Sequence, residues 1–94
     1  SGVRVKNLKS QELSSFNCDG VFIFVGIVPN TAFLKDLVKM DESGFVIINQ
    51  EMQTSREGVF ACGDCAKKSL YQVISACGEG ATAADSAHKY LIKK

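Results

Sequence analysis

The segment TSREGVFACGD, residues 54–64, is the most informative about the fold, because a turn, a short apolar run and a Gly-Asp pair follow one another in it. Arg56, Glu57 and Gly58 are typical of a turn, and residues 59–61 predict a short buried strand that ends at residues 63–64. Buried parallel strands need neighbouring strands and covering helices, which the rest of the chain supplies only sparsely. The segment therefore predicts a strand of a sheet that is completed elsewhere.

A second apolar segment lies upstream, at residues 20–25 (GVFIFV). Its continuous β-branched and aromatic residues predict a strand that is covered on both faces, and it too lacks a companion strand. Before it, alternating apolar and basic residues predict a half-exposed strand at residues 3–8, and polar residues 9–19 predict a turn or loop. After it, Pro29 stops sheet pairing in a loop at residues 26–30.

The remaining segments predict a mixed α/β arrangement. Asn30 or Thr31 is expected to cap a short helix whose apolar face carries Phe33, Leu34, Leu37 and Val38. Residues 45–48 and 51–53 predict two short strands after a turn at residues 41–44. The last third predicts one helix over roughly residues 70–92. Gly78 and Gly80 each weaken such a helix by about 1 kcal/mol, so we expect another backbone to pack closely there.

Composition narrows the function classes. The 94 residues are 46% hydrophobic and 22% charged, with a net charge of +1, as in a globular protein. No basic patch indicates nucleic-acid binding, and no apolar run is long enough to span a membrane. Because the chain begins at Ser1 rather than Met, we expect it to be either processed or part of a longer polypeptide.

Three motifs together resemble one family. Residues 54–64 resemble the signature of FAD-dependent pyridine-nucleotide oxidoreductases, in which a G-V-[FY]-A strand ends in Gly-Asp. Residues 26–31 (GIVPNT) look like the family's G-x-x-P-N-T crossover between domains, and residues 71–84 (YQVISACGEGATAA) are similar to its third motif. The resemblance implies an incomplete α/β, FAD/NAD(P)-binding Rossmann-like fold with an antiparallel β-hairpin and a long C-terminal helix.

Within that family, the Gln72-Val73 pair and the Gly-Glu-Gly-Ala run look most like the C-terminal part of low-molecular-weight thioredoxin reductases. Residues 1–28 would end the NADPH-binding domain and residues 29–94 would be the returning part of the FAD-binding domain. The resemblance implies FAD, NADPH held by the rest of the parent flavoprotein, thioredoxin as substrate, a homodimer and a cytoplasmic location. Alternatives are a related flavin reductase of the NADPH–ferredoxin or peroxiredoxin-reducing type, and a non-catalytic stand-alone module.

The resemblance also implies which residues contact the flavin. Gly63 lets the backbone approach the cofactor, and the Asp64 carboxylate would accept hydrogen bonds from a ribityl hydroxyl. The helix N-terminus would face the pyrimidine edge of the flavin and stabilise negative charge at N1–C2=O. The expected cofactor-binding residues are Gly63, Asp64, Tyr71, Gln72, Val73 and Ile74. Tyr71 stands where these reductases often have arginine, which replaces a polar contact by an aromatic ring.

The pair Cys62 and Cys65 has the spacing of a redox dithiol, but Gly63 and Asp64 between them are the residues that the flavin needs. We therefore expect packing roles for both cysteines, with an accessory redox role or a metal site as alternatives. We expect no catalytic residue and no metal ligand in this chain, and solvated positions for Lys67, Lys68 and His88. No G-x-G-x-x-G loop is present, so we expect the isolated chain to be inactive.

Overall fold

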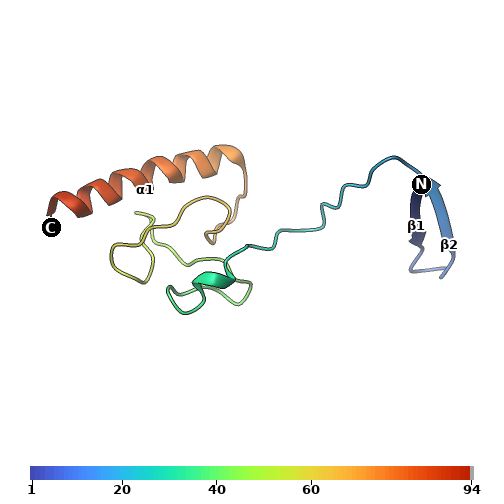
Figure 1. Ribbon diagram of the computed structural model, residues 1–94, viewed down its shortest axis with the longest axis horizontal. Coiled ribbons are helices and arrows are strands. Elements are labelled where there is room, and N and C mark those ends of the chain that lie inside the picture. Colours follow the sequence, from blue (N-terminus) through green and yellow to red (C-terminus); the bar gives the residue numbers. More distant parts are fainter. Residues whose placement is uncertain (94) are drawn as a thin grey trace.

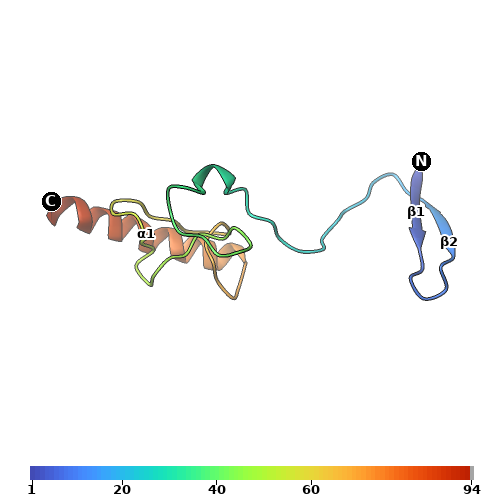
Figure 2. The same ribbon diagram turned by 90° about the horizontal axis from the view of Figure 1, so that it is seen from below.

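The computed structural model describes residues 1–93 and consists of two parts joined by an extended segment (Figure 1). One part is a hairpin of strands β1 (Gly2–Lys6) and β2 (Leu13–Asn17). The other contains a short 3₁₀ helix η1 (Ala32–Leu34), irregular loops and the long helix α1 (Val73–Lys93). Figure 2 shows the same separation from a second direction. The principal-axis extents are 63 × 26 × 22 Å.

Strands β1 and β2 pair antiparallel, with Val3 opposite Phe16 and Val5 opposite Ser14. The strand predicted at residues 3–8 is confirmed over most of its length, as is the antiparallel hairpin. The loop predicted at residues 9–19 is wrong, because β2 occupies five of those residues. Its serines carry no clear alternation, and the strand forms because β1 supplies a partner and Asn7 Oδ1 organises the turn through Lys9 N–H at 2.9 Å.

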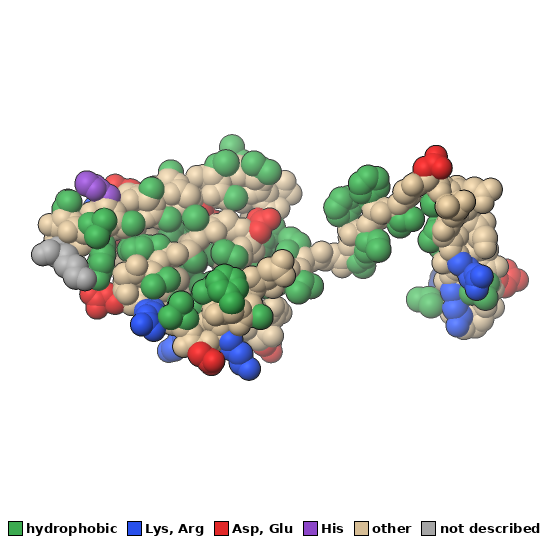
Figure 3. Space-filling view, viewed as in Figure 1, with side chains coloured by type: hydrophobic (Ala, Val, Ile, Leu, Met, Phe, Trp, Pro, Cys, Tyr) green, Lys and Arg blue, Asp and Glu red, His purple; other side chains and the backbone are tan. Residues whose placement is uncertain are grey.

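Residues 20–25, predicted as a buried strand, are neither paired nor buried. They run as the extended segment between the two parts (Figure 1), and Phe24 is 90% exposed. A strand forms only where a neighbour accepts its backbone hydrogen bonds, and β1 and β2 pair with each other. Figure 3 shows the resulting hydrophobic side chains along this segment. The outcome agrees with the expectation that the strand lacks a companion in this chain.

The surface is far larger than a folded monomer of this mass exposes. It amounts to 7729 Å² for 10.2 kDa, whereas a compact protein of that mass exposes about 5300 Å². The radius of gyration is 19.5 Å, against about 12 Å for a compact chain of this length. Large apolar side chains contribute to the exposed surface, among them Phe22 at 85% exposure.

The small core lies between the loops and α1. Val46 and Ala66 are fully buried and form a parallel bridge, in which Val46 N–H donates to Cys65 O at 2.8 Å. The strands predicted at residues 45–48, 51–53 and 59–61 appear only as isolated bridges, such as Gln53 to Phe60. Val46 bridges to Met40 and Ala66, and Gln53 bridges to Phe60, so these runs make single-residue bridges and no continuous strand.

The helix predicted after residue 31 shrinks to the single turn of η1, and Thr31 does not cap it through its side chain. Thr31 is buried, and its hydroxyl donates instead to the Gly44 carbonyl across the loop. The turn at residues 41–44 is confirmed, since Asp41 Oδ1 accepts hydrogen bonds from Ser43 N–H and Phe45 N–H, both at 2.9 Å. Thr31 therefore ties η1 to the loop that follows it.

Helix α1 confirms the predicted C-terminal helix but begins three residues later, at Val73. Apart from neighbouring residues and the backbone of α1 itself, no atom of residues 1–93 lies within 4 Å of the positions that Cβ atoms on Gly78 and Gly80 would take, so the close packing expected there is not provided by this chain. Val73 and Ile74 are 79% and 81% exposed. No helix within residues 1–93 has the length and apolarity to cross a membrane.

Candidate functional site

A concavity of about 420 Å³ lies where the chain enters α1, and Asp64, Tyr71, Gln72 and Val73 line it with Ala76 and Cys77. Four of the six predicted cofactor-binding residues are therefore brought together on one surface. Gly63 adjoins Asp64 without lining the concavity. Ile74 lies in the first turn of α1 but points into solvent rather than into this hollow, with 81% of its surface exposed.

The N-terminus of α1 forms one wall of the concavity. The hydroxyl of Ser75 accepts a hydrogen bond from Gln72 N–H at 3.2 Å and lies 2.8 Å from the Gln72 carbonyl, to which it can donate. This contact sets where the helix starts, since a side chain at the third helical position reaches back to the residue before the helix. The first turn contains no acidic residue, so its positive dipole end is not neutralised locally.

The turn around Gly63 carries Asp64, which lines the concavity. Gly63 has φ +84°, a conformation that glycine adopts without the steric cost of a side chain. Ala66 N–H donates to the Gly63 carbonyl at 3.1 Å and closes the turn. Asp64, at the tip of this turn, is exposed and faces the concavity. Its carboxylate is free of salt bridges among the described residues and is available to accept hydrogen bonds.

Two charged side chains that the sequence did not single out lie behind this turn. Glu79 Oε1 accepts a hydrogen bond from Gly63 N–H at 2.9 Å. Lys68 Nζ donates to the Gly63 carbonyl and forms an ion pair with Glu79. The expectation of a solvated Lys68 is wrong, because its side chain is only 10% exposed, whereas Lys67 is solvated at 62%. No sequence period singles out Lys68 and Glu79, because their contact joins a loop to a helix.

Tyr71 is held through both its ring and its hydroxyl. The ring packs against Phe45, with centroids 5.2 Å apart and planes tilted by 43°. Its hydroxyl accepts a hydrogen bond from Lys68 N–H at 3.4 Å, and Lys68 Nζ lies 5.8 Å from the ring centroid. Tyr71 therefore presents an apolar ring to the concavity, with its hydroxyl bound to the protein.

The cysteines are free thiols. Cys62 and Cys65 are half-buried, and Cys65 Sγ donates to the Cys62 carbonyl at 3.4 Å. This contact turns the Cys65 thiol toward the backbone of its own loop. Cys18 is half-buried and distant in sequence, and Cys77 is exposed at the concavity. Within residues 1–93, no group of three or more His, Cys, Asp or Glu side chains is placed to hold a metal ion.

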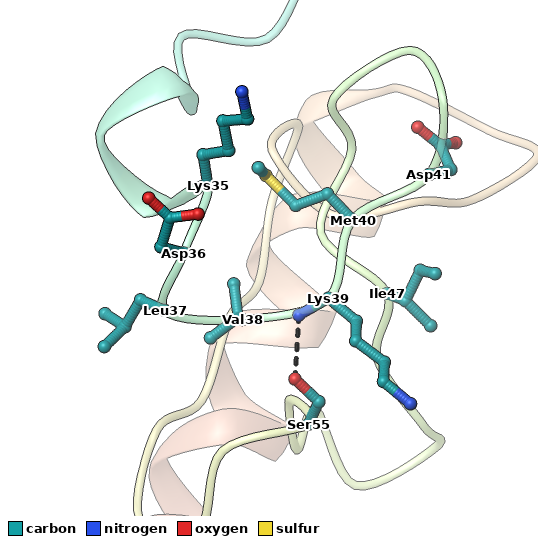
Figure 4. Close-up of a pocket in the computed structure, with 9 residues that line it drawn as sticks. All are labelled: Lys35, Asp36, Leu37, Val38, Lys39, Met40, Asp41, Ile47 and Ser55. Atoms are coloured by element: carbon teal, nitrogen blue, oxygen red, sulfur yellow. Dashed lines mark hydrogen bonds between the residues drawn. The ribbon is translucent and has the colours of Figure 1, made fainter.

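A second concavity, of about 550 Å³, is lined by residues 35–41 with Ile47 and Ser55 (Figure 4). Ser55 Oγ accepts a hydrogen bond from Lys39 N–H at 2.7 Å, which ties the segment after η1 to the turn before residue 56. Lys35 and Lys39 extend away from each other in Figure 4, so they do not form a common charged site. None of the predicted site residues lies here.

Comparison with known proteins identifies the family. Residues 1–80 match the family described as pyridine nucleotide-disulphide oxidoreductase. The chain belongs to this family. Among sequence relatives, it is 45% identical to the thioredoxin reductase of Treponema pallidum, over 97% of this chain and 29% of that protein. It is 37% identical to a component of alkyl hydroperoxide reductase in Staphylococcus aureus, over 99% of this chain and 18% of that protein.

Solved structures of the pyridine nucleotide-disulphide oxidoreductase family have the same arrangement. The thioredoxin reductase of Lactococcus lactis aligns with a TM-score of 0.84 and 38% identity, over 99% of this chain and 31% of that chain. The thioredoxin reductase of T. acidophilum aligns with a TM-score of 0.83 and 41% identity, over 97% of this chain and 30% of that chain. The chain thus spans less than a third of these relatives, and the expected incomplete Rossmann-like fold is confirmed.

Proposed function

We propose that this chain is the C-terminal part of a thioredoxin reductase and forms one side of its FAD site. The observation that carries the proposal is the 420 Å³ concavity, which gathers Asp64, Tyr71, Gln72 and Val73 from two separate segments. The likeness to thioredoxin reductases over nearly the whole chain supports the parent enzyme. In our proposal, residues 1–28 end the NADPH-binding domain and residues 29–94 return to the FAD-binding domain.

The residues at the concavity fit a flavin. FAD supplies electron transfer between a nicotinamide and a disulfide when it is bound. Asp64 offers a carboxylate that can accept hydrogen bonds from hydroxyl groups at the concavity. The first turn of α1, at Val73 and Ile74, offers backbone N–H donors and a positive dipole end without an acidic neighbour. Tyr71 offers an apolar ring that covers a flat ligand. The concavity thus combines hydrogen-bond donors, one acceptor and an apolar ring, which complement the polar edge, the hydroxyl groups and the flat ring system of a flavin.

The rest of the enzyme lies outside this chain in our proposal. The longer parent holds the pyrophosphate of FAD, NADPH and the reactive dithiol, and it reduces thioredoxin as a cytoplasmic homodimer. The exposed segment at residues 20–25 supports such a parent, since its apolar side chains need a sheet to cover them. The isolated chain has no catalytic residue of its own and is inactive.

A peroxiredoxin-reducing flavoprotein is the second candidate, because the alkyl hydroperoxide reductase component is 37% identical over 99% of the chain. The full-length protein separates the two. With NADPH supplied, a thioredoxin reductase reduces thioredoxin directly, whereas the second candidate reduces its peroxiredoxin partner and leaves thioredoxin oxidised. Thioredoxin reduction measured with 5,5′-dithiobis(nitrobenzoate) supports our proposal, and turnover with the peroxiredoxin alone contradicts it. An NADPH–ferredoxin type reductase would turn over ferredoxin instead.

Cys65→Ser in the full-length protein is expected to leave NADPH-to-thioredoxin turnover within about twofold of the parent. The Cys65 thiol bonds to the carbonyl of Cys62 within its own loop, a contact that a serine hydroxyl reproduces. Steady-state turnover and the flavin-to-protein absorbance ratio check this, with Cys18→Ser as the control, because Cys18 is a half-buried free thiol that does not line the concavity. A large loss of turnover with the flavin retained would show that Cys62 and Cys65 act as an accessory dithiol.

A further inference from the structure

A half-buried ion pair binds both backbone polar groups of Gly63. Glu79 Oε1 accepts a hydrogen bond from Gly63 N–H at 2.9 Å, and Lys68 Nζ donates to the Gly63 carbonyl. Lys68 and Glu79 also bind each other, with side-chain exposures of 10% and 17%. The N–H of Gly63 is therefore bound by an acidic side chain, and its carbonyl is bound by a basic one. We call Lys68, Glu79 and Gly63 the clamp.

Gly63 needs such a restraint. Its φ of +84° lies in a region that glycine visits freely, alongside many other conformations. Apart from Gly63 and its two chain neighbours, no atom of residues 1–93 lies within 4 Å of the position that a Gly63 Cβ would take, so side chains packed there do not confine it. The hydrogen bonds of the clamp, together with the Ala66 N–H bond to the Gly63 carbonyl, therefore determine the direction in which Asp64 leaves the turn.

The clamp also contacts Tyr71, which lines the concavity. Lys68 N–H donates to the Tyr71 hydroxyl at 3.4 Å, and Lys68 Nζ lies 5.8 Å from the Tyr71 ring centroid. Glu79 comes from α1, whose first turn carries Val73. One ion pair thus links the turn that carries Asp64, the ring of Tyr71 and the helix that carries Val73. All three line the same concavity.

We propose that Lys68 and Glu79 are positioning residues that fix the Asp64 carboxylate against α1 for flavin binding. This inference rests on the proposed function. Taking two charges out of water costs free energy, and a neutral apolar pair of similar size is often no less stable. The arrangement of the pair has a direction. Gly63 N–H needs an acceptor at position 79, and the Gly63 carbonyl, which also accepts from Ala66 N–H, receives its second hydrogen bond from a donor at position 68.

Charge reversal tests that direction in the full-length protein. The double variant Lys68→Glu/Glu79→Lys retains opposite charges but sets a donor against Gly63 N–H and an acceptor against its carbonyl. We expect its FAD dissociation constant to rise by about tenfold or more, while the melting temperature of the flavin-free protein stays near that of the parent. The exposed pair Asp85 and Lys89, 2.7 Å apart, supplies the control: Asp85→Lys/Lys89→Asp is expected to change neither quantity.

Two single variants of Glu79 test the positioning role if the charge reversal also lowers the melting temperature. Glu79→Gln keeps an acceptor oxygen for Gly63 N–H and is expected to bind FAD within about threefold of the parent, whereas Glu79→Leu is expected to bind about tenfold more weakly. Equal affinities for these two variants would overturn the clamp, as would parental affinity in the charge reversal. If Asp64→Ala weakens FAD binding while Glu79→Leu does not, the clamp fails and the proposed function stands. If Asp64→Ala itself keeps parental affinity, the proposed function fails.

Discussion

Asp64→Ala in the full-length flavoprotein is expected to release FAD during dialysis. A hydrogen bond to a charged group contributes about 1.5–3 kcal/mol, so the loss of this acceptor would weaken FAD binding by roughly one to two orders of magnitude. Asp64 lines the concavity from an exposed turn tip, and none of the ion pairs formed among residues 1–93 involves it. Its removal is therefore expected to weaken FAD binding more than it lowers the stability of the fold.

The ratio of flavin to protein absorbance after dialysis measures the effect of Asp64→Ala. Asp85→Ala is the matched control, because Asp85 is an exposed aspartate on α1 whose ion pair with Lys89 is worth little in water. We expect this control to keep its flavin. Full flavin occupancy in Asp64→Ala would show that Asp64 does not contribute to flavin binding.

Phe24→Asp in the full-length protein is expected to abolish soluble folding or to lower the melting temperature by more than about 10 °C. Phe24 is 90% exposed in this chain, within an apolar segment that has no partner strand among the described residues. If the parent covers this segment with a sheet and helices, the substitution buries an unpaired carboxylate, which is among the costliest changes a core can undergo.

Soluble yield and thermal unfolding measure the effect of Phe24→Asp. Leu8→Asp is the control, because Leu8 is 80% exposed in the polar turn between β1 and β2. It is expected to fold as the parent does. A Phe24→Asp protein with parental yield and melting temperature would show that residues 20–25 stay in solvent, and would contradict a parent sheet that completes this strand.

Local patterns were enough to predict β1 and α1. Alternation over residues 3–6 and the helical spacing after residue 72 are properties of contiguous sequence, and both elements formed. The strand at residues 20–25 did not form, because pairing depends on a neighbour that its own residues cannot specify. The same dependence reduced the strand predicted at residues 59–61 to one bridge, from Phe60 to Gln53.

The candidate site divides in the same way. Asp64, Tyr71, Gln72 and Val73 were predicted from motif resemblance, and they line one concavity. Lys68 was predicted as a solvated residue, because its pairing with Glu79 joins a loop to a helix and follows no sequence period. Whether Lys68 faces solvent is set by where α1 crosses the Gly63 turn, which only the three-dimensional arrangement reveals.

In our proposal, this chain provides one side of a flavin site, and another part of the same enzyme completes it. Titration of FAD into the purified 94-residue chain, monitored by quenching of flavin fluorescence, tests it directly. We predict no stoichiometric binding by the chain alone, and retention of one FAD when the chain is co-expressed with the remainder of its parent. Tight binding of one FAD by the isolated chain would contradict the claim.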